Sequence, residues 1–456
     1  MYSFADEPSN LRITSNMKTS LHKLLLLLSA LAALQVRAVA GDFQIRDGDH
    51  VVFLGDSITE QRLYTTYIEA YALTRHPQWK LTFRNVGWGG DTAWLRQRTH
   101  PDEGVLFAAD SHVQQEMVED SVGRGLKRDV LPLKPTLVTI KFGMNDHSYQ
   151  PFREDIFRAY VRSQTQLAKV LEASGARVAF LTPQPIEEKR ADPNQDVRNL
   201  SLRKFSDGLK EVAAKEGATF VDQFDPYMAM LVRERAANPP GFVGGGDTVH
   251  PGPIGHTVMA WAVLKGLGAP TLVSRAEIDA VAGKCVGSED CRISELKVSD
   301  GKVSFDRLDE ALPMPIDPKA ERALELAPIL DELSRYELKI TGLPQGTYEV
   351  SIDGEAVGKV GTQDLTKGWN LTVNAGPVTR QARQLLSLVF QKNNTFFARW
   401  RDVQLYNFPG WARSPENETM RSAELSKLDH QIEQQEAQID EARKPKSHHF
   451  ELKPAG

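Results

Sequence analysis

Ser57 stands where a serine could act as a nucleophile. It follows the apolar run of residues 51–54, so it lies just beyond the end of an expected strand. A serine hydroxyl is too weak an acid to attack a substrate unless a neighbouring base takes its proton. Without a base, a serine at this position would serve as a helix cap, and the segment alone leaves both interpretations open.

A base with an orienting partner occurs in residues 247–250, where two residues separate Asp247 from His250. One short turn can present both side chains, so that the carboxylate fixes the histidine tautomer and stabilises the imidazolium. The spacing therefore suits a Ser-His-Asp relay with Ser57. On its own, the same spacing is common in solvated loops. We interpret the glycine run at residues 244–246 as slack for a catalytic loop.

Two further segments carry groups that could stabilise the negative charge of a tetrahedral intermediate. Residues 86–92 are rich in glycine, and at Gly90 the backbone N–H can approach a substrate closely because no Cβ intervenes. Residues 141–146 end in Asn145 and Asp146, and the asparagine amide can donate to developing charge. Turns favour the same residue types, so each segment alone is also consistent with a turn.

A sheet has to position these segments. From residue 49 to about 267, β-rich runs alternate with stretches such as 155–174 and 197–215, whose apolar residues recur at helical spacing. This alternation is typical of an α/β fold with a parallel sheet, whose site lies at the carboxyl ends of the strands. The expected strands are residues 51–54, 81–85, 137–140, 177–181 and 218–221.

Four motifs in this order resemble those of the SGNH hydrolases, also called the GDSL family. Ser57 falls on the serine of the family's first block, Gly90 on the second-block glycine before Asp-Thr, and Asn145 on the third-block asparagine of G-x-N-D. Asp247 and His250 fall on the fifth-block D-x-x-H. The resemblance implies a flavodoxin-like three-layer α/β/α sandwich, in agreement with the alternation of strands and helices.

The resemblance further implies ester hydrolysis through an acyl-enzyme. Ser57 would be the nucleophile, His250 the base and Asp247 the partner of that base. An oxyanion hole would be formed by the N–H groups of Ser57 and Gly90 and by the side-chain amide of Asn145. This chemistry requires no cofactor and no metal.

Other polar residues beside the motifs have expected roles of their own. We expect Asp56 and Asp146 to tie loops together and His256 to be structural in the following helix. We expect His147 to lie at the rim of the site. Metal binding is not required of any of them.

Tryptophans and arginines near the second block leave alternatives open. Trp88 and Trp94 could stack on a sugar, although tryptophans this close to a sheet edge are core residues at least as often. The sequence does not decide which arginines line the cleft and which face solvent. The three in question are Arg62, Arg96 and Arg98.

The resemblance covers about residues 51–267, and the character of the chain changes after about residue 270. Several β-rich runs follow, and Asp353-Gly354 is a two-residue hairpin signal. They indicate a second, smaller and mainly antiparallel unit, followed by a helix over residues 377–392. The expected divisions are an N-terminal extension with a signal peptide (1–40), the hydrolase domain (41–275), a β-rich accessory domain with a helix (285–410) and a charged helical C-terminal tail (411–456).

Two roles are open for the accessory domain: a wall beside the catalytic cleft, or a separate module that binds polymer. It carries no recognisable acid-base or metal constellation. The candidates for a wall are Trp369, Trp400, Arg399 and Arg401, although Trp400 also fits a core position.

The tail over residues 416–443 is rich in Glu, Gln, Ala and Lys, with apolar residues at helical spacing. Its two heptads are fewer than the three or four that argue for a coiled coil. The pattern favours a helix docked on the protein's own surface, and self-association through this helix is the alternative.

The N-terminus predicts export. The apolar run of residues 24–34 follows Lys18 and Lys23 and precedes an Ala-x-Ala end, which is the signal-peptide pattern and too short a run to span a bilayer. Residues before Met17 add nothing to it, so either Met1 or Met17 could be the start. We expect a periplasmic or extracellular protein with no membrane insertion after cleavage. In that compartment Cys285 and Cys291 would form a disulfide, since no third cysteine competes.

Length limits the number of domains, and net charge limits the classes of partner. A length of 456 residues is compatible with two or three domains, and a net charge of −5 provides no positive field for nucleic acid. This charge fits a neutral or weakly charged substrate. The resemblance to exported SGNH enzymes with appended β-rich units implies an acylated carbohydrate or another small ester. The alternatives are a lipase, a lysophospholipase or an acyl-thioesterase, and, from another class, an inactive glycan-binding or scaffolding protein.

Overall fold

A computed structural model describes residues 42–188, 192–237 and 241–455, and the chain from Phe43 onward forms one compact unit. The expected signal peptide therefore lies outside the described residues. Within the described ranges, no helix combines the length and the apolar character that crossing a bilayer would need.

The central sheet of the catalytic part is parallel and five-stranded, with the order β2-β1-β3-β4-β5. This is the flavodoxin-like order, in which the chain reverses its direction of travel between β1 and β3. The predicted α/β sandwich is thereby confirmed. The strands are β1 (His50–Gly55), β2 (Thr82–Asn85), β3 (Leu137–Lys141), β4 (Arg177–Leu181) and β5 (Thr219–Val221).

Helices cover both faces of this sheet because successive side chains of each strand point to opposite sides. In β1, Val51 and Phe53 belong to one buried cluster, whereas Val52 and Leu54 belong to the other. The first cluster packs against α3 (Leu63–Arg75), α9 (Phe224–Ala237) and α10 (Pro253–Gly266). The second packs mainly against α6 (Ser111–Asp129), α7 (Glu154–Ala173) and α8 (Val197–Glu216). Shorter elements are α2 (Ser57–Glu60), α4 (Arg96–Thr99), α5 (Glu103–Ala108) and η1 (Leu131–Leu133).

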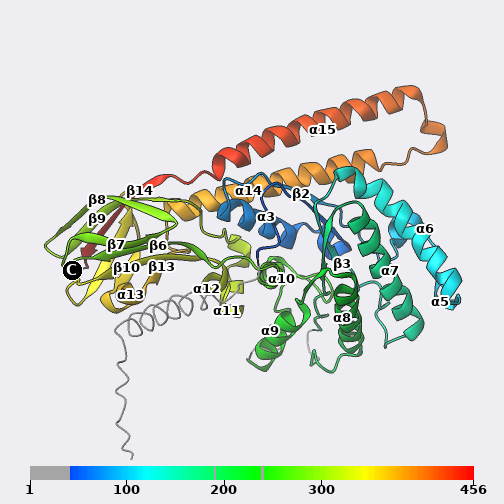
Figure 1. Cartoon of the computed structure of the whole chain (residues 1–456), viewed down its shortest axis with the longest axis horizontal. Coiled ribbons are helices and arrows are strands. Elements are labelled where there is room, and N and C mark those ends of the chain that lie inside the picture. The colour runs from blue at the N-terminus through cyan, green and yellow to red at the C-terminus, as the bar shows by residue number, and fades with distance from the viewer. Residues whose placement is uncertain (1–41, 189–191, 238–240, 456) are drawn as a thin grey trace, which may run out of the picture. The chain divides into compact units, whose positions relative to one another are not determined.

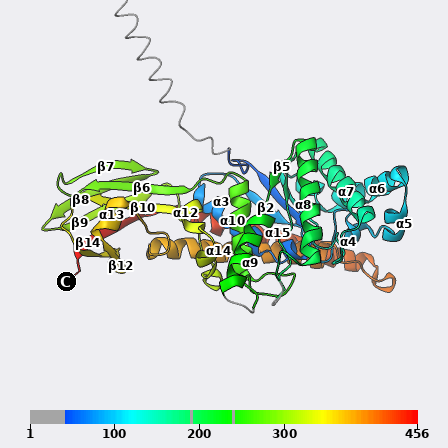
Figure 2. The same ribbon diagram turned by 90° about the horizontal axis from the view of Figure 1, so that it is seen from below.

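Two smaller sheets with their own apolar core form the accessory part (Figure 2). One has the order β13-β10-β6-β7, in which β10 and β6 are parallel. Its strands are β6 (Leu272–Asp279), β7 (Lys284–Glu289), β10 (Arg335–Thr341) and β13 (Trp369–Asn370). The other is wholly antiparallel, with the order β12-β11-β14-β9-β8. Its strands are β8 (Cys291–Ser299), β9 (Lys302–Asp309), β11 (Thr347–Ile352), β12 (Glu355–Gly361) and β14 (Ser447–Pro454).

The Asp353-Gly354 hairpin joins β11 to β12 as predicted, and both residues have positive φ. Short helices lie between β9 and β10 and between β12 and β13. They are η2 (Pro318–Ala320), α11 (Ala323–Leu326), α12 (Ile329–Leu333) and α13 (Thr362–Lys367).

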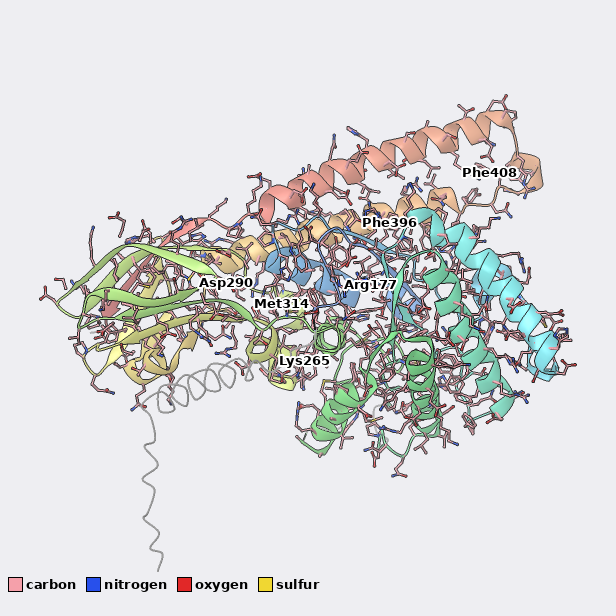
Figure 3. The ribbon with its side chains drawn as sticks, in the orientation of Figure 1. Arg177, Lys265, Asp290, Met314, Phe396 and Phe408 are labelled. Carbon is pink, nitrogen blue, oxygen red and sulfur yellow. The ribbon has the colours of Figure 1, made fainter. Side chains whose placement is uncertain are left out.

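The C-terminal helices lie along the catalytic part. α14 (Pro377–Phe397) packs on α3 and leads into a π-helical turn, η3 (Ala398–Gln404). After η4 (Gly410–Ala412), α15 (Pro415–Ala442) runs back along α14, with Ile432 and Ile439 buried (Figure 1). The expected docking of this helix on the protein's own surface is confirmed. Phe396 and Met314, labelled in Figure 3, are buried in the two clusters that flank the catalytic sheet.

The tail expected to be helical over residues 411–456 contains the helix α15, but its last residues form a strand. After α15 the chain forms β14, which hydrogen-bonds to β9 on one side and to β11 on the other. Its alternating burial places His448, Phe450 and Leu452 inside the accessory part. The physical reason is that these residues complete a sheet whose other strands lie far away in sequence.

The predicted disulfide was also wrong, because Cys285 and Cys291 are free. The segment expected to turn between them is strand β7, which is extended from Lys284 to Glu289. At ~3.3 Å per residue an extended segment carries the two Cα atoms beyond the ~4.4–6.8 Å that a disulfide requires. Sγ of Cys285 donates to the carbonyl of Gly287, and Sγ of Cys291 to that of Arg275.

Candidate active site

Ser57 occupies the first turn of α2, directly beyond the carboxyl end of β1. Asp56, not Ser57, is the cap of this short helix, since its Oδ1 accepts a hydrogen bond from the N–H of Ile58 at 3.0 Å. The half-buried Ser57 hydroxyl is therefore left for another partner. As the first residue of a helix, Ser57 also has an N–H without an intrahelical acceptor.

That partner is His250, whose Nε2 lies 2.9 Å from Oγ of Ser57. Nδ1 of the same ring lies 3.3 Å from Oδ2 of Asp247. The backbone N–H groups of His250 and Val249 donate to Oδ1 of Asp247 at 2.7 and 2.8 Å. The structure thus brings together the three residues predicted to form the relay, in the predicted order of contacts.

The side chain of Asp247 is 64% exposed, and hydrogen-bond donors further stabilise its ionised form. Partial burial would raise its pKa, but the donors from His250 and Val249 outweigh this effect and lower the pKa below its ordinary value. Water screens its attraction for the imidazolium at this exposure. At this exposure Asp247 is suited to orient His250 more than to supply buried charge.

The glycine run before Asp247 is closely packed, which corrects its interpretation as slack. Gly246 has a φ of +74°, and a Cβ on it would lie 2.1 Å from the carbonyl oxygen of His250. That carbonyl accepts a hydrogen bond from the N–H of Asp247 at 2.9 Å. Glycine is therefore required for the loop to close on itself and hold the imidazole in place.

The two other predicted segments converge on the same edge of the sheet. Gly90 has a φ of +76°, and within the described ranges no acceptor is recorded for its N–H. The carbonyl of Gly90 accepts from Nε of Arg96 at 2.8 Å. Nδ2 of the buried Asn145 donates to the carbonyl of Asp91 at 2.9 Å, which ties the amide to the loop that carries Gly90.

Tyr149 is a neighbour that sequence reasoning missed. Its hydroxyl donates to Oδ1 of Asn145 at 3.0 Å, so the oxygen of the amide is engaged and the nitrogen faces Asp91. Burial raises the pKa of Tyr149 to about 12, so that it remains a donor at neutral pH. A Tyr four residues after the motif Asn is the only signal in the sequence.

Asp146 ties loops together, as predicted. It accepts from the N–H groups of Ala93 and Gly143, both at 2.8 Å, and so joins the second and third motifs. Burial raises its pKa to about 7, against the effect of these two donors.

Of the histidines beside the motifs, one expectation held and one did not. His256 is buried in α10, where Nδ1 accepts from the N–H of Tyr64 and Nε2 lies 2.8 Å from Oε1 of Gln61. It is structural, as expected. His147 is buried, not at the rim, because its Nδ1 lies 3.1 Å from the carbonyl of Gly143 inside the turn of the third motif.

Burial decides the alternatives for Arg98 and Trp94. Arg98 is fully buried between Asp91 and Asp129, at 2.8 Å from each, and Trp94 belongs to the core. Trp88 is half-buried, and Cζ of Arg401 lies 3.7 Å above the centroid of its ring. One of the two faces that a sugar could have used is thereby covered.

The accessory candidates separate in the same way. Trp400 is buried and makes an edge contact with Trp88, whereas Arg401 stacks on Trp88 and lies near Glu60 of α2. Trp369 lies in strand β13 of the accessory part, and Arg399 pairs with Asp429 of α15. In the described residues no cluster of His, Cys, Asp and Glu is arranged to hold a metal ion.

Comparison with known proteins agrees with this geometry. A family profile described as GDSL-like lipase/acylhydrolase matches residues 53–258. These residues include all five predicted site residues, and over them the chain is similar to the GDSL-like lipase/acylhydrolase family. The resemblance drawn from the four motifs is confirmed, and this GDSL-like chain is a serine ester hydrolase.

Two proteins similar to this GDSL-like hydrolase differ in how much of the chain they match. An acetylxylan esterase from Geobacillus stearothermophilus is 26% identical over 243 residues, which are 51% of this chain and the whole of the relative. The solved structure of a gut microbial diltiazem-metabolizing enzyme is 25% identical, with a TM-score of 0.73. The match covers 90% of this chain and 98% of the chain of that enzyme, so the likeness extends through the accessory part as well.

Proposed function

We propose that this GDSL-like hydrolase is an exported esterase that removes acetyl or similar small acyl groups from carbohydrate through an acyl-enzyme on Ser57. The observation that carries the proposal is the hydrogen-bonded chain from Ser57 through His250 to Asp247. Ser57 lies at the same edge of the sheet as Gly90 and Asn145. In the described part of the molecule the N–H of Gly90 has no recorded acceptor, and the amide of Asn145 is tied to the Gly90 loop.

In this mechanism Oγ of Ser57 attacks the ester carbonyl while Nε2 of His250 takes its proton. The oxyanion of the tetrahedral intermediate accepts hydrogen bonds from the N–H groups of Ser57 and Gly90 and from the Asn145 amide. His250 then protonates the departing alcohol, which leaves an acyl-Ser57. Water attacks this ester with His250 again as base, and the carboxylic acid and free Ser57 are released.

The choice of a carbohydrate acetyl ester rests on the acetylxylan esterase, which covers only the catalytic half of this chain. The relative that matches nearly the full length is named for metabolism of diltiazem, which is not a sugar. Acyl group and alcohol therefore have to be varied independently in any test.

Export rests on the pattern of residues 24–40, and its test is independent of catalysis. We expect the protein from fractionated cells to begin near Gly41 and to lie outside the cytoplasm. N-terminal sequencing of the purified native protein measures this directly, and an intact N-terminus in the cytoplasmic fraction would contradict it.

The activity is tested by acetate release from a panel of acetylated glycans and by hydrolysis of 4-nitrophenyl esters of increasing acyl length. We expect acetyl esters to be preferred and at least one acetylated glycan to be a substrate. Ser57→Ala and His250→Ala should each lower turnover by several orders of magnitude while leaving the thermal unfolding curve in place. Turnover by Ser57→Ala within tenfold of the wild type would rule out the mechanism, and a preference for long acyl chains would point to a lipase instead.

A further inference from the structure

One face of α14 and of the π-helical turn after it carries a stripe of side chains at alternating intervals of four and three residues. The stripe comprises Arg383, Ser387, Phe390, Asn394, Phe397 and Arg401. These intervals place side chains on one side of a helix. At ~1.5 Å per residue, the stripe spans roughly 27 Å from residue 383 to residue 401.

The near end of the stripe is Arg401, beside the proposed oxyanion hole. Its guanidinium stacks on Trp88, which stands two residues before Gly90. Its nearest carboxylate is that of Glu60, with 3.8 Å between Nε and Oε1, which is too long for a hydrogen bond. Among the described residues no hydrogen-bond acceptor is recorded for this guanidinium. Stacking thus fixes its plane while its N–H donors stay available to a ligand.

The middle of the stripe is joined to the nucleophile's helix by Arg62. Its Cζ lies 4.0 Å from the ring centroid of Phe397, and its Nε donates to Oδ1 of Asn394 at 3.1 Å. Its Nη1 donates to the carbonyl of Glu60, the last residue of α2, at 2.7 Å. A π-helical turn follows directly, and such turns occur frequently at functional sites.

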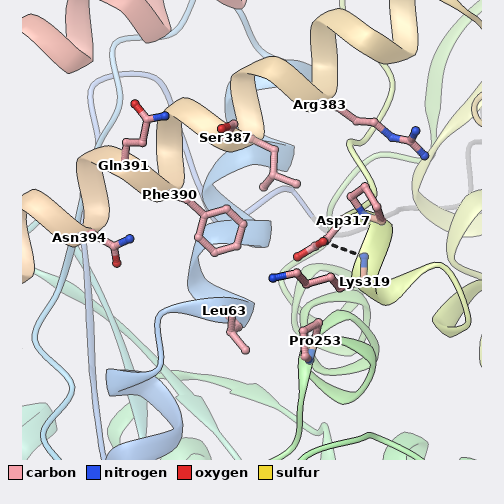
Figure 4. A pocket seen from close by; sticks show the side chains of 11 residues that line it. Leu63, Pro253, Asp317, Lys319, Arg383, Ser387, Phe390, Gln391 and Asn394 are labelled. Atoms are coloured by element: carbon pink, nitrogen blue, oxygen red, sulfur yellow. Dashed lines mark hydrogen bonds between the residues drawn. The ribbon is translucent and has the colours of Figure 1, made fainter.

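The far end of the stripe opens into a cavity of about 420 Å³, shown in Figure 4. Asn394 lines it, so the cavity is continuous with the contacts of Arg62. Pro253 also lines it and follows His250 by three residues, which at ~3.8 Å per step limits their Cα separation to about 11 Å. The volume lies within the range of small-molecule sites.

The walls of this cavity are held in place by contacts of their own. Phe390 packs edge-on against Tyr67, whose hydroxyl donates to Oδ2 of Asp317 at 2.9 Å. Nη2 of Arg383 pairs with Glu321 at 2.9 Å, while its Nε is buried without a partner among the described residues. The cavity is thus preformed, with aromatic and aliphatic walls and polar groups at its rim.

The charges along the stripe point to a neutral ligand. Near the catalytic edge the arginines Arg62 and Arg401 are matched by the carboxylates of Glu60 and Asp402, which act on both of them. Burial lowers the pKa of both arginines, and the two carboxylates oppose this effect. Apolar faces combined with balanced donors and acceptors suit a chain of sugar rings better than a polyanion.

We propose that the stripe and its cavity bind the carbohydrate portion of the substrate, which would run from the ester at Ser57 past Arg401 to Phe390. The proposal rests on the proposed esterase function and adds where the alcohol part of the substrate lies. α14 is then part of the substrate site, and the specificity of the enzyme is divided between the two parts of the molecule.

The test compares a longer acetylated xylo-oligosaccharide with 4-nitrophenyl acetate as substrates. The measured quantity is the ratio of kcat/KM for the oligosaccharide to kcat/KM for the small ester. We expect this ratio to fall about tenfold in Phe390→Ala and severalfold in Arg383→Ala, mainly through KM for the oligosaccharide. Arg380→Ala is the control. Arg380 is an exposed arginine of the same helix, α14, and pairs with Glu355 of β12, so its removal should leave the ratio unchanged.

Each alternative gives a distinct result. A ratio within twofold of the wild type in both cavity variants, or an equal fall in Arg380→Ala, would overturn the proposal. A change confined to longer 4-nitrophenyl acyl esters would also overturn it and assign the cavity to the acyl chain. Failure of the proposed function differs from both, because the wild-type enzyme would then hydrolyse 4-nitrophenyl acetate but no acetylated glycan.

Because Phe390→Ala could loosen α14, binding is measured as well. Ser57→Ala should bind the acetylated oligosaccharide in calorimetry, and adding Arg383→Ala should weaken that binding severalfold. Equal affinity of the two proteins would contradict the proposal independently of turnover.

Discussion

Nζ of Lys392 on α14 lies 2.7 Å from Oε1 of Glu69 on α3, and both side chains are buried. Asn393 also donates to Oε2 of Glu69 at 2.9 Å. Burial raises the pKa of Glu69 and lowers that of Lys392, and their mutual attraction opposes both shifts. A desolvated ion pair therefore holds α14 against α3 of the catalytic part.

Breaking this pair from one side should cost more stability than removing it altogether. We expect Lys392→Met to lower the free energy of unfolding by about 3–5 kcal/mol, because the carboxylate of Glu69 is left buried without its partner. The double variant Glu69→Gln/Lys392→Met should be clearly more stable than Lys392→Met alone. Urea denaturation measures both, and a double variant as unstable as the single one would show that the charge of Glu69 is not the cause.

Tyr149 should act as a positioning residue for the Asn145 amide. Tyr149→Phe removes the hydrogen bond to Oδ1 and leaves the amide freer to rotate. We expect kcat on 4-nitrophenyl acetate to fall about tenfold with little change in KM, since the oxyanion forms only in the transition state. A rise in KM with unchanged kcat would instead assign Tyr149 to ground-state binding.

Acid should destabilise the protein through its buried histidines. Burial, together with Lys141 and His250, lowers the pKa of His256 to about 3, and burial lowers the pKa values of His76 and His147 to about 4. Between these values and the ~6.5 of an unfolded histidine, the unfolded chain binds more protons, so stability falls as pH falls through this window.

The variant His256→Gln isolates one of these contributions. Its melting temperature should depend less steeply on pH between about pH 6.5 and pH 4 than that of the wild type. His112→Gln is the matched control, because His112 is an exposed residue and should not alter the slope. Parallel pH profiles for His256→Gln and the wild type would contradict the burial argument.

Both thiols should be detectable in denatured, unreduced protein. In the folded protein Cys285 should react first, because it is exposed, whereas burial raises the pKa of Cys291 to about 11 and keeps it a thiol. Timed thiol titration before and after denaturation measures the two rates. Absence of free thiols after denaturation would restore the disulfide that the sequence suggested.

Removing β14 should make the protein aggregate. Deletion after Lys444 would leave β9 and β11 with unpaired edges in the middle of a sheet. We expect loss of soluble protein, as measured by light scattering, whereas deletion after Pro454 should be tolerated. A soluble, monomeric protein without β14 would contradict this.

A larger deletion, of all residues after about Pro270, should damage folding or activity even on small esters. Leu385, Leu386 and Val389 of α14 lie in the same apolar cluster as the helices of the catalytic part, and their removal would expose that face. A truncated protein fully active on small esters but impaired on polymer would show that the accessory part is an independent module.

The local features of the catalytic part could be predicted from sequence. Ser57, Gly90, Asn145, Asp247 and His250 each follow a recognisable strand or turn signal, and the order of the signals carries the topology. Ser57, Gly90 and Asn145 come together because parallel strands end at one edge of the sheet, whereas Asp247 and His250 lie in the loop between α9 and α10.

What escaped prediction depends on contacts between distant segments. Lys392 on a helix reads as a solvated charge until Glu69 is known to face it, and residues 447–454 read as a polar tail until β9 and β11 lie beside them. Arg401 likewise gains its position only from Trp88. Neither composition nor periodicity encodes such pairings, because they arise from tertiary packing.

The central place of β14 also constrains the order in which the chain acquires its structure. Arg307 of β9 pairs with His448 of β14, so β9 cannot complete its pairing until a strand more than a hundred residues later has been synthesised. Synthesis from the N-terminus produces β8, β9, β11 and β12 before β14, so β9 and β11 each have an open edge until β14 is made. Such long-range closure is slow, and exposed edges invite association with other chains. Completion of this sheet by β14 is therefore the folding step at which a chaperone would most increase the yield of folded protein.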